Sequence, residues 1–552
     1  MFLKNKNILK LILIFLVLSV VVLFLYMPVF KNFFQQDEWA GFANYYSVGY
    51  NQYILNSLLP DPGHYVPLFK MVFATEFKFF GFNHNIWVMV SILWHILNSF
   101  LVYLLAKKIF KLEWQSITSS ILFAVFAAGQ QATSWVVANG ATQGATTFVI
   151  LSLIYFFDNK IGLSLVMLVV SMLFKEISIG IFAFIPLIII FQNYVQKKKM
   201  FDKRIFYFLG VTVFYIIFRY LTFLGIFSDV KAPVITESQS KLEILFNIAT
   251  FPIKAIAQTS IPSFVYLETS KLIAEKLPDG IAGAPATTFF DNFYLKYVFQ
   301  SLNLLVFIII LLITIFVASF KKNRLTAISV FGLIFVAISS VIYALSPGRS
   351  GFVPIIDSRN LYLPSIGIIF FLVGIVSVIK KWKLSVLILF ILILFNIIIT
   401  RLELNKISDV GQDRIKILHQ ISKDNLKLSN KQIFYIESDT SYYGLPDEIR
   451  ILPFQSGFGQ TLLVWYSNYT DFPKDFYKDH FLWDIDSQGY KEIDGRGFGY
   501  FRNFDLLITT LKEYNLPVDS VIAYSWNSKE SKLTNITEVT RSKLKNEKVI
   551  RK

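Results

Sequence analysis

Apolar runs alternate with short polar or basic segments through residues 1–401. Eleven such runs occur, near residues 8–30, 85–106, 117–129, 142–157, 161–174, 179–195, 205–226, 297–320, 325–346, 362–379 and 384–400. A helix needs about 17–25 residues to cross a bilayer, and several runs reach that length. The runs at 117–129 and 161–174 are shorter, so they require tilt, polar extension or burial among other helices. The pattern predicts an all-α polytopic membrane domain with about 11 transmembrane helices.

Residues 402–552 have a different pattern, with no apolar run long enough to span a membrane. Short stretches of β type, such as Gln432–Ile436 and Thr461–Tyr466, lie between turns rich in Gly, Pro, Asn and Asp. We expect a small α+β domain here, with its boundary to the membrane domain between residues 401 and 402. Two long loops, 31–84 and 227–296, interrupt the membrane domain, and an apolar stretch in the second is typical of an interfacial or re-entrant segment.

Composition agrees with the apolar pattern, since 55% of the residues are hydrophobic and the mean hydropathy is +0.55. No cysteine occurs in the sequence, which excludes disulfides, Cys-ligated zinc and thiol nucleophiles. The net charge of +16 does not indicate nucleic-acid binding, because residues 402–552 hold 21 acids and 21 bases whereas residues 1–401 hold 16 acids and 32 bases. The excess of bases falls in short loops, as the positive-inside rule predicts for cytoplasmic segments.

These basic loops predict a cytoplasmic N-terminus and a C-terminal domain outside the cell membrane. Of the 16 acids before residue 402, only Glu113, Asp158 and Asp202 then lie on the cytoplasmic side. Any chemistry is therefore expected on the outer side. Lys, Ile, Asn and Phe are frequent, which is typical of a bacterium with an A/T-rich genome, so the cytoplasmic membrane is the expected location.

Asp37 and Glu38 form an acid pair shortly after the first apolar run. Such a pair can activate an acceptor hydroxyl or hold a divalent ion. The alternative is a structural role at a helix start, with Asp37 as the N-cap and Glu38 interacting with the helix dipole.

Lys175 and Glu176 lie between two apolar runs, where charged residues are costly unless they are paired or functional. They either mark a tight turn or face a common cavity. Arg219 lies toward the outer end of its apolar run and needs an anionic partner, which is a phosphate if Arg219 is functional. Its alternative is to extend toward the interface without a specific role. Arg349, Asp357 and Arg359 follow in a later outer loop.

His64 and His95 are candidate site residues, although a lone histidine is more often a hydrogen-bonded structural residue. The sequence lacks the HExxH, GxSxG and phosphate-loop patterns and any Cys/His metal spacing. Hydrolase and ATPase functions therefore lose their usual sequence support.

An ordered series of motifs resembles the membrane glycosyltransferases of the GT-C fold, in particular the branch near the TMTC-type protein O-mannosyltransferases. The resemblance covers about residues 30–370 and rests on Gly63-His64-Tyr65-Val66-Pro67-Leu68, Phe80-Gly81-Phe82-Asn83, Trp94-His95-Ile96-Leu97-Asn98, Leu101-Val102-Tyr103-Leu104, Ser134-Trp135-Val136 with Gly140, Leu173-Phe174-Lys175-Glu176 and Arg359-Asn360-Leu361-Tyr362-Leu363-Pro364-Ser365.

The resemblance implies an enzyme that moves a sugar from a polyprenyl-phosphate carrier to an acceptor hydroxyl on the outer face. If the acceptor attacks opposite to the leaving phosphate, the transfer inverts the anomeric centre. Asp37, with Glu38 beside it, then corresponds to the catalytic acid of the first outer loop. The expected contacts with donor phosphate or substrate come from five further residues: His64, Lys175, Glu176, Arg219 and Arg359.

The sequence departs from these relatives at Gln131, where they tend to have an acid four residues before the Trp of the second outer loop. The sequence therefore predicts no particular cofactor. A divalent metal is a candidate, but the missing carboxylate argues against it. The tetratricopeptide tail of the TMTC branch is also absent from the sequence, so the acceptor is left open. Two other functions stay open, a transporter or flippase of lipid-linked sugars and a catalytically silent scaffold. A flippase needs polar residues along a membrane route, whereas most runs have Leu, Ile, Val and Phe at their centres.

Overall fold

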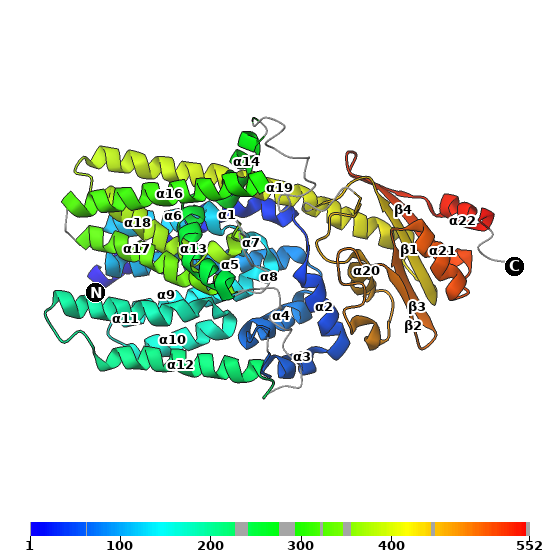
Figure 1. The fold of residues 1–552 in the computed structure, drawn as a ribbon, viewed down its shortest axis with the longest axis horizontal. Helices are drawn as coiled ribbons and strands as arrows, with labels where there is room; N and C mark the ends of the chain where they lie inside the picture. The colour runs from blue at the N-terminus through cyan, green and yellow to red at the C-terminus, as the bar shows by residue number, and fades with distance from the viewer. Residues whose placement is uncertain are drawn as a thin grey trace.

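The computed structural model describes residues 2–61, 63–226, 241–274, 276, 293–320, 324–345, 355–442 and 448–547. The chain is mostly helical, with a small sheet near its C-terminus. Figure 1 shows a bundle of long helices and, at one end of it, a domain that contains the sheet. Arg349 and residues 227–240, 275 and 277–292 of the second loop lie outside the described residues.

Each of the eleven predicted runs falls on a helix of the bundle. These helices are α1 (Phe2–Tyr26), α5 (His84–Ile109), α6 (Glu113–Val125), α9 (Gly144–Phe157), α10 (Ile161–Phe174), α11 (Ile179–Val195), α12 (Lys203–Phe223), α16 (Phe293–Phe320), α17 (Arg324–Ser340), α18 (Pro364–Ser377) and α19 (Trp382–Asp424). Among the described residues, eight helical segments are long and apolar enough to cross a membrane, while α10 and α18 are shorter apolar helices. The chain is therefore a multi-pass membrane protein. The count of about 11 spans stays a prediction.

Glycines allow two helices of the bundle to approach closely. A Cβ atom on Gly332 of α17 would overlap the carbonyl oxygen of Gly367 on α18. Because lipid provides no hydrophobic drive between helices, small residues that permit backbone contact are what let such helices pack.

Loop 31–84 folds into helices at the end of the bundle that faces the sheet domain (Figure 1). They are α2 (Asp37–Val48), α3 (Tyr50–Ser57) and α4 (Pro67–Phe80), and the short η1 (Met27–Lys31) precedes them. Their aromatic side chains form a dense cluster with the start of α5, in which Phe42 stacks on Phe77 with ring centroids 4.2 Å apart. This cluster holds α2, and with it Asp37 at its first residue, in place against the bundle.

The described part of the second loop forms α13 (Lys241–Ser260) and α14 (Ser263–Ala274). α13 packs against α17 and α18 of the bundle. The side chain of Gln258 accepts a hydrogen bond of 2.8 Å from the backbone N–H of Ile356, which ties α13 to the segment before Arg359. A helix that returns into the bundle fits the re-entrant interpretation.

Short helical turns connect the longer elements. They are η2 (Ala127–Gly129), α7 (Gln131–Ser134), α8 (Val136–Ala138), the π-helix η3 (Asn139–Gln143), η4 (Glu176–Ser178), η5 (Val341–Leu345) and η6 (Ser358–Leu361). Several lie at the ends of the apolar helices, where most of the candidate site residues are found.

α19 is one continuous helix of 43 residues that extends from the bundle into the sheet domain (Figure 1). The predicted boundary between residues 401 and 402 falls inside it. Leu404, Ile417 and Leu418 of its second half are buried in the same core as residues of both regions. The composition changes at residue 401, but the helix continues. Its apolar side contacts lipid in the first half and packs against protein in the second half.

The C-terminal domain contains a five-stranded sheet in the order β2-β3-β1-β4-β5. β1 pairs in parallel with both β3 and β4, so that Ile433 lies opposite Gly499 on one side and Val521 on the other. The outer pairs, β2 with β3 and β4 with β5, are antiparallel. The elements are β1 (Lys431–Ser438), α20 (Phe458–Tyr466), η7 (Lys474–Tyr477), β2 (Gly489–Ile493), β3 (Arg496–Phe501), α21 (Phe504–Glu513), η8 (Val518–Ser520), β4 (Val521–Asn527), β5 (Lys532–Asn535) and α22 (Thr537–Asn546).

The prediction of β structure is confirmed for Gln432–Ile436, which lies in β1, but it is wrong for Thr461–Tyr466, which belongs to α20. Every residue of α20 is buried. A short segment buried on all sides has no polar face, so its periodicity cannot distinguish a helix from a strand.

Candidate active site

Asp37 is the first residue of α2, at the end of the bundle near the sheet domain. Gln36 occupies the N-cap position and makes no side-chain cap, while the Glu38 carboxylate accepts a hydrogen bond of 3.0 Å from the Gln36 N–H. The structural alternative therefore applies to Glu38 rather than to Asp37. Asp37 keeps part of its surface exposed to solvent, although much of it is surrounded by protein.

The electrostatics of Asp37 favour its protonated form. Desolvation by the surrounding protein raises the pKa of Asp37; the positive charge of Arg359 partly offsets this, and the negative charge of Asp357 adds to it. A carboxylate with a raised pKa is a stronger base than an ordinary aspartate. Asp37 is thus both accessible and suited to accept a proton.

Arg359, whose charge acts on this carboxylate, is held by contacts with three other residues. Its guanidinium lies over the Trp135 ring at 4.1 Å from the ring centroid, and its Nη2 lies 3.3 Å from an Asp357 oxygen. The Arg359 N–H donates to the side-chain oxygen of Gln131 at 3.4 Å. We call Asp37, Gln131, Trp135, Asp357 and Arg359 the Asp37 cluster.

Lys175 lies next to the Asp37 cluster through the residue after Arg359. Its ammonium group donates to Asn360 at 3.2 Å and to Thr142 at 2.9 Å, and it lies 5.6 Å from the centroid of the Tyr343 ring. Arg359 lies in η6, and Lys175 contacts the next residue of the same turn, so two positive groups lie close to this turn.

Glu176 points to different partners from those of Lys175, although the two residues are adjacent in a tight turn. One Glu176 oxygen lies 3.1 Å from His64 Nδ1, and the other lies 3.4 Å from Arg219 Nη2 and accepts from the Tyr215 hydroxyl at 3.4 Å. We call these four residues the Glu176 cluster. The predicted anionic partner of Arg219 exists, and it is a carboxylate of the protein itself.

Arg219 also fixes the backbone of loop 31–84. It donates to the carbonyl oxygens of Asp61 at 2.6 Å and Gly63 at 2.7 Å. Asp61 in turn pairs with Lys70 at 2.7 Å; burial alone would raise the pKa of Asp61, but the Lys70 hydrogen bond and charge hold that pKa below its ordinary value. The Glu176 cluster is thus bonded internally, and the roles of His64, Glu176 and Arg219 in donor binding stay predictions.

Glu38 faces the interior, between the bundle and the C-terminal domain. Its side chain is 1% exposed, and burial raises its pKa to about 7. The positive charge of Arg414, which is itself 2% exposed, acts in the opposite direction. Arg414 donates to the carbonyl of Pro453 at 2.6 Å and to the side-chain oxygen of Asn32 at 3.3 Å, so it joins α19, loop 31–84 and the sheet domain.

The sequence interpretation missed Arg414. A signal was present, because Leu404, Gly411, Arg414 and Leu418 recur at helical spacing along the buried side of α19. A charge in such a row is expected to have partners from other elements.

His95 has the structural role that the sequence left as the alternative. Its Nδ1 lies 2.7 Å from the Tyr362 hydroxyl, and its Nε2 lies 3.1 Å from the Ala124 carbonyl oxygen. Asn98 extends this network by accepting from Thr147 at 2.7 Å. His95 therefore links α5 to the turn before α18.

No group of three or more His, Asp or Glu side chains that could hold a metal occurs among the described residues. At Gln131, where the motif resemblance led us to expect an acid, the amide oxygen accepts from the backbone N–H of Arg359. That the protein works without a divalent metal stays a prediction from the sequence.

Comparison with known proteins adds no relative: no protein-family model matches the chain, and no curated protein matches it.

Proposed function

We propose that this protein is a membrane glycosyltransferase that moves a sugar from a polyprenyl-phosphate donor to an acceptor hydroxyl. The observation that supports this best is the Asp37 cluster, which combines an accessible carboxylate of raised pKa with a guanidinium fixed on an indole ring. Transfer from a phosphate carrier needs a base for the acceptor and a positive group for the leaving phosphate.

In the proposed reaction, Asp37 accepts the proton of the acceptor hydroxyl as its oxygen attacks the anomeric carbon. The bond between that carbon and the phosphate oxygen breaks, and its electron pair stays on the polyprenyl phosphate. Attack opposite to the leaving group inverts the anomeric centre. Arg359 and Lys175 stabilise the charge that grows on the phosphate.

The proposed location is the cytoplasmic membrane of a bacterium, with the Asp37 cluster and the sheet domain outside. The arrangement in Figure 1 supports this assignment, because the chain begins at the end of the bundle away from the sheet domain. A cytoplasmic N-terminus, expected from the basic loops, then places the sheet domain on the outer side.

The test is a transfer assay in nanodiscs with a panel of polyprenyl-phosphate sugars, comparing the wild type with Asp37→Asn. We expect Asp37→Asn to lower turnover by about 10²–10⁴, the usual contribution of a positioned base. Asp409→Asn removes a second exposed carboxylate, on α19, and is the matched control. Near-normal turnover of Asp37→Asn would refute the assignment of the base.

Two other outcomes separate the alternatives. Movement of the intact donor across the bilayer without transfer would establish a flippase. A folded wild type that neither consumes nor moves any donor of the panel would favour the scaffold. The missing carboxylate at Gln131 would then be the first residue to explain the lack of activity.

A further inference from the structure

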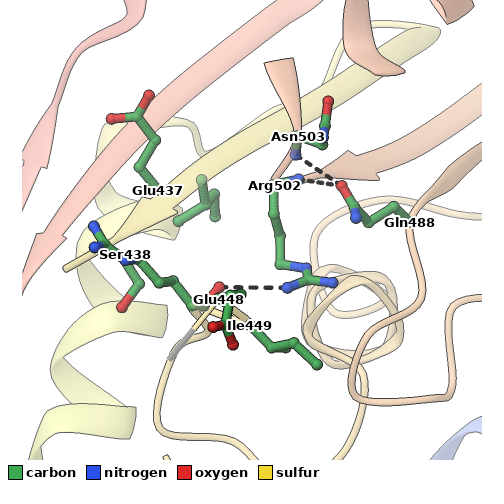
Figure 2. A pocket seen from close by; sticks show the side chains of 9 residues that line it. Glu437, Ser438, Glu448, Ile449, Gln488, Arg502 and Asn503 are labelled. Atoms are coloured by element: carbon green, nitrogen blue, oxygen red, sulfur yellow. Dashed lines mark hydrogen bonds between the residues drawn. The ribbon is translucent and has the colours of Figure 1, made fainter. Parts of the chain in front are cut away.

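A second candidate site lies in the C-terminal domain, away from the Asp37 cluster. It is a cavity of about 480 Å³, within the range of ordinary small-molecule sites. Residues from the end of β1, the segment 448–450, Gln488, and Arg502 and Asn503 after β3 line it (Figure 2).

The sheet topology explains why a cavity forms at this place. After β1 the chain continues to α20, which packs on the face of the sheet that holds Phe434, while after β3 it continues to α21, which packs on the face that holds Ile433. Neighbouring parallel strands whose connections leave to opposite faces open a crevice at their carboxyl ends. Ligands of open α/β sheets bind in such crevices.

Part of the polar lining is already used in holding the cavity together. Figure 2 shows Gln488 directed toward the two residues after β3, where its side-chain oxygen accepts from the N–H groups of Arg502 at 2.7 Å and Asn503 at 2.8 Å. Arg502 donates through its two terminal nitrogens to the carbonyls of Arg450 at 3.4 Å and Asp486 at 3.0 Å. The wall is therefore built before a ligand arrives.

Other polar groups of the same wall are not used in hydrogen bonds within the described protein. Within the described residues, the guanidinium of Arg450, the carboxylate of Glu448 and the amide nitrogens of Gln488 and Asn503 make no hydrogen bond, and all four side chains line the cavity. These groups comprise three donors and one acceptor, beside the aliphatic carbons of Ile436 and Ile449.

We propose that this cavity binds a saccharide through its hydroxyl groups. A sugar hydroxyl both donates and accepts hydrogen bonds, so it suits a wall of amide, guanidinium and carboxylate groups. A phosphate or another compact anion fits less well, because Glu437 and Glu448 line the cavity together with the arginines.

The cavity is connected to the Asp37 cluster by a short piece of chain. Arg450 lines the cavity, and five residues later the N–H of Gln455 donates to the carbonyl of Gln35 at 2.9 Å, two residues before Asp37. Five residues span at most about 18 Å. A saccharide chain that is held in the cavity could therefore extend toward Asp37, and its role as the acceptor rests on the proposed transferase function.

The test is a glycan array probed with the labelled full-length protein in detergent. We expect the wild type to bind at least one glycan that Arg450→Ala binds about tenfold more weakly, as the loss of a hydrogen bond to a charged group predicts. Glu448→Gln keeps the shape of the side chain and is expected to weaken the same glycan. Lys512→Ala removes an exposed positive charge from α21, outside the cavity, and is the control.

The proposal is overturned if no glycan binds, if Arg450→Ala binds the same glycans equally well, or if inorganic phosphate competes for the site. Asp37→Asn separates this proposal from the transferase function, because it is expected to keep the glycan while losing turnover. If the acceptor role is also correct, Arg450→Ala raises KM for the acceptor and leaves kcat nearly unchanged.

Discussion

The Asp37 cluster and the Glu176 cluster are both made of charged residues that a membrane domain would normally avoid, yet they differ in how their charges are used. Glu176 divides its two oxygens between His64 and Arg219. Asp37, in contrast, is exposed, and its pKa is raised. The difference shows that charged residues between apolar helices do not by themselves define an active site. What matters is whether the protein has already satisfied that charge.

After Asp37→Asn, the largest effect that distinguishes the clusters is expected from Arg359→Gln. Removal of a positive group aimed at the leaving phosphate should lower turnover by about 10²–10³, with little change in the thermal unfolding midpoint. Arg324→Gln, at the start of α17, is the control for a general loss of positive charge. Turnover equal to that of the control would remove Arg359 from the reaction.

Glu38 sharpens the comparison because it is adjacent to Asp37 but buried like an interior group. Its pKa is raised from 4.5 to about 7, so the folded protein keeps this proton between these pH values while the unfolded chain loses it. Glu38 should therefore contribute a fall in stability of about 3 kcal/mol as pH rises through this window, and no further change above it. Glu38→Gln should reduce this slope by the share that Glu38 contributes when unfolding midpoints are measured from about pH 5 to about pH 8. An unchanged slope would show that another group titrates.

Arg219→Gln tests the Glu176 cluster directly. The variant loses the ion pair with Glu176 and the bonds to two backbone carbonyls of loop 31–84, so we expect a loss of about 2 kcal/mol in stability. The thermal unfolding midpoint measures this loss, and turnover at low temperature shows whether the site survives. Lost turnover with an unchanged midpoint would instead place Arg219 in contact with the donor.

Trp135→Phe should give the smallest effect. Phenylalanine keeps an aromatic face under the Arg359 guanidinium but weakens the cation–π contact by about 0.5–1 kcal/mol, which corresponds to a two- to fivefold loss of turnover. Trp382→Phe changes an exposed tryptophan at the start of α19 and is the control. A larger loss for Trp135→Phe would indicate that the indole also contacts the substrate.

Much of the fold could be predicted because apolar length is a local property. Every predicted apolar run falls on a helix, and Gln432–Ile436 lies in a strand. Thr461–Tyr466 was predicted wrongly because complete burial removes the polar face that a periodicity argument needs. The boundary at residue 401 followed composition, whereas α19 continues through it because lipid and protein both accept an apolar helix face.

The sequence by itself determined that this chain is a multi-pass membrane protein and which of its segments are apolar helices, since both depend on runs of neighbouring residues. Only the tertiary structure decided which charges are satisfied. His64 and Glu176 are 112 residues apart in the chain, and Gln131 and Arg359 are 228 apart. Such pairs leave no periodic signal, because the fold of the whole bundle brings them together, and this pairing separates the internally bonded Glu176 from the accessible Asp37.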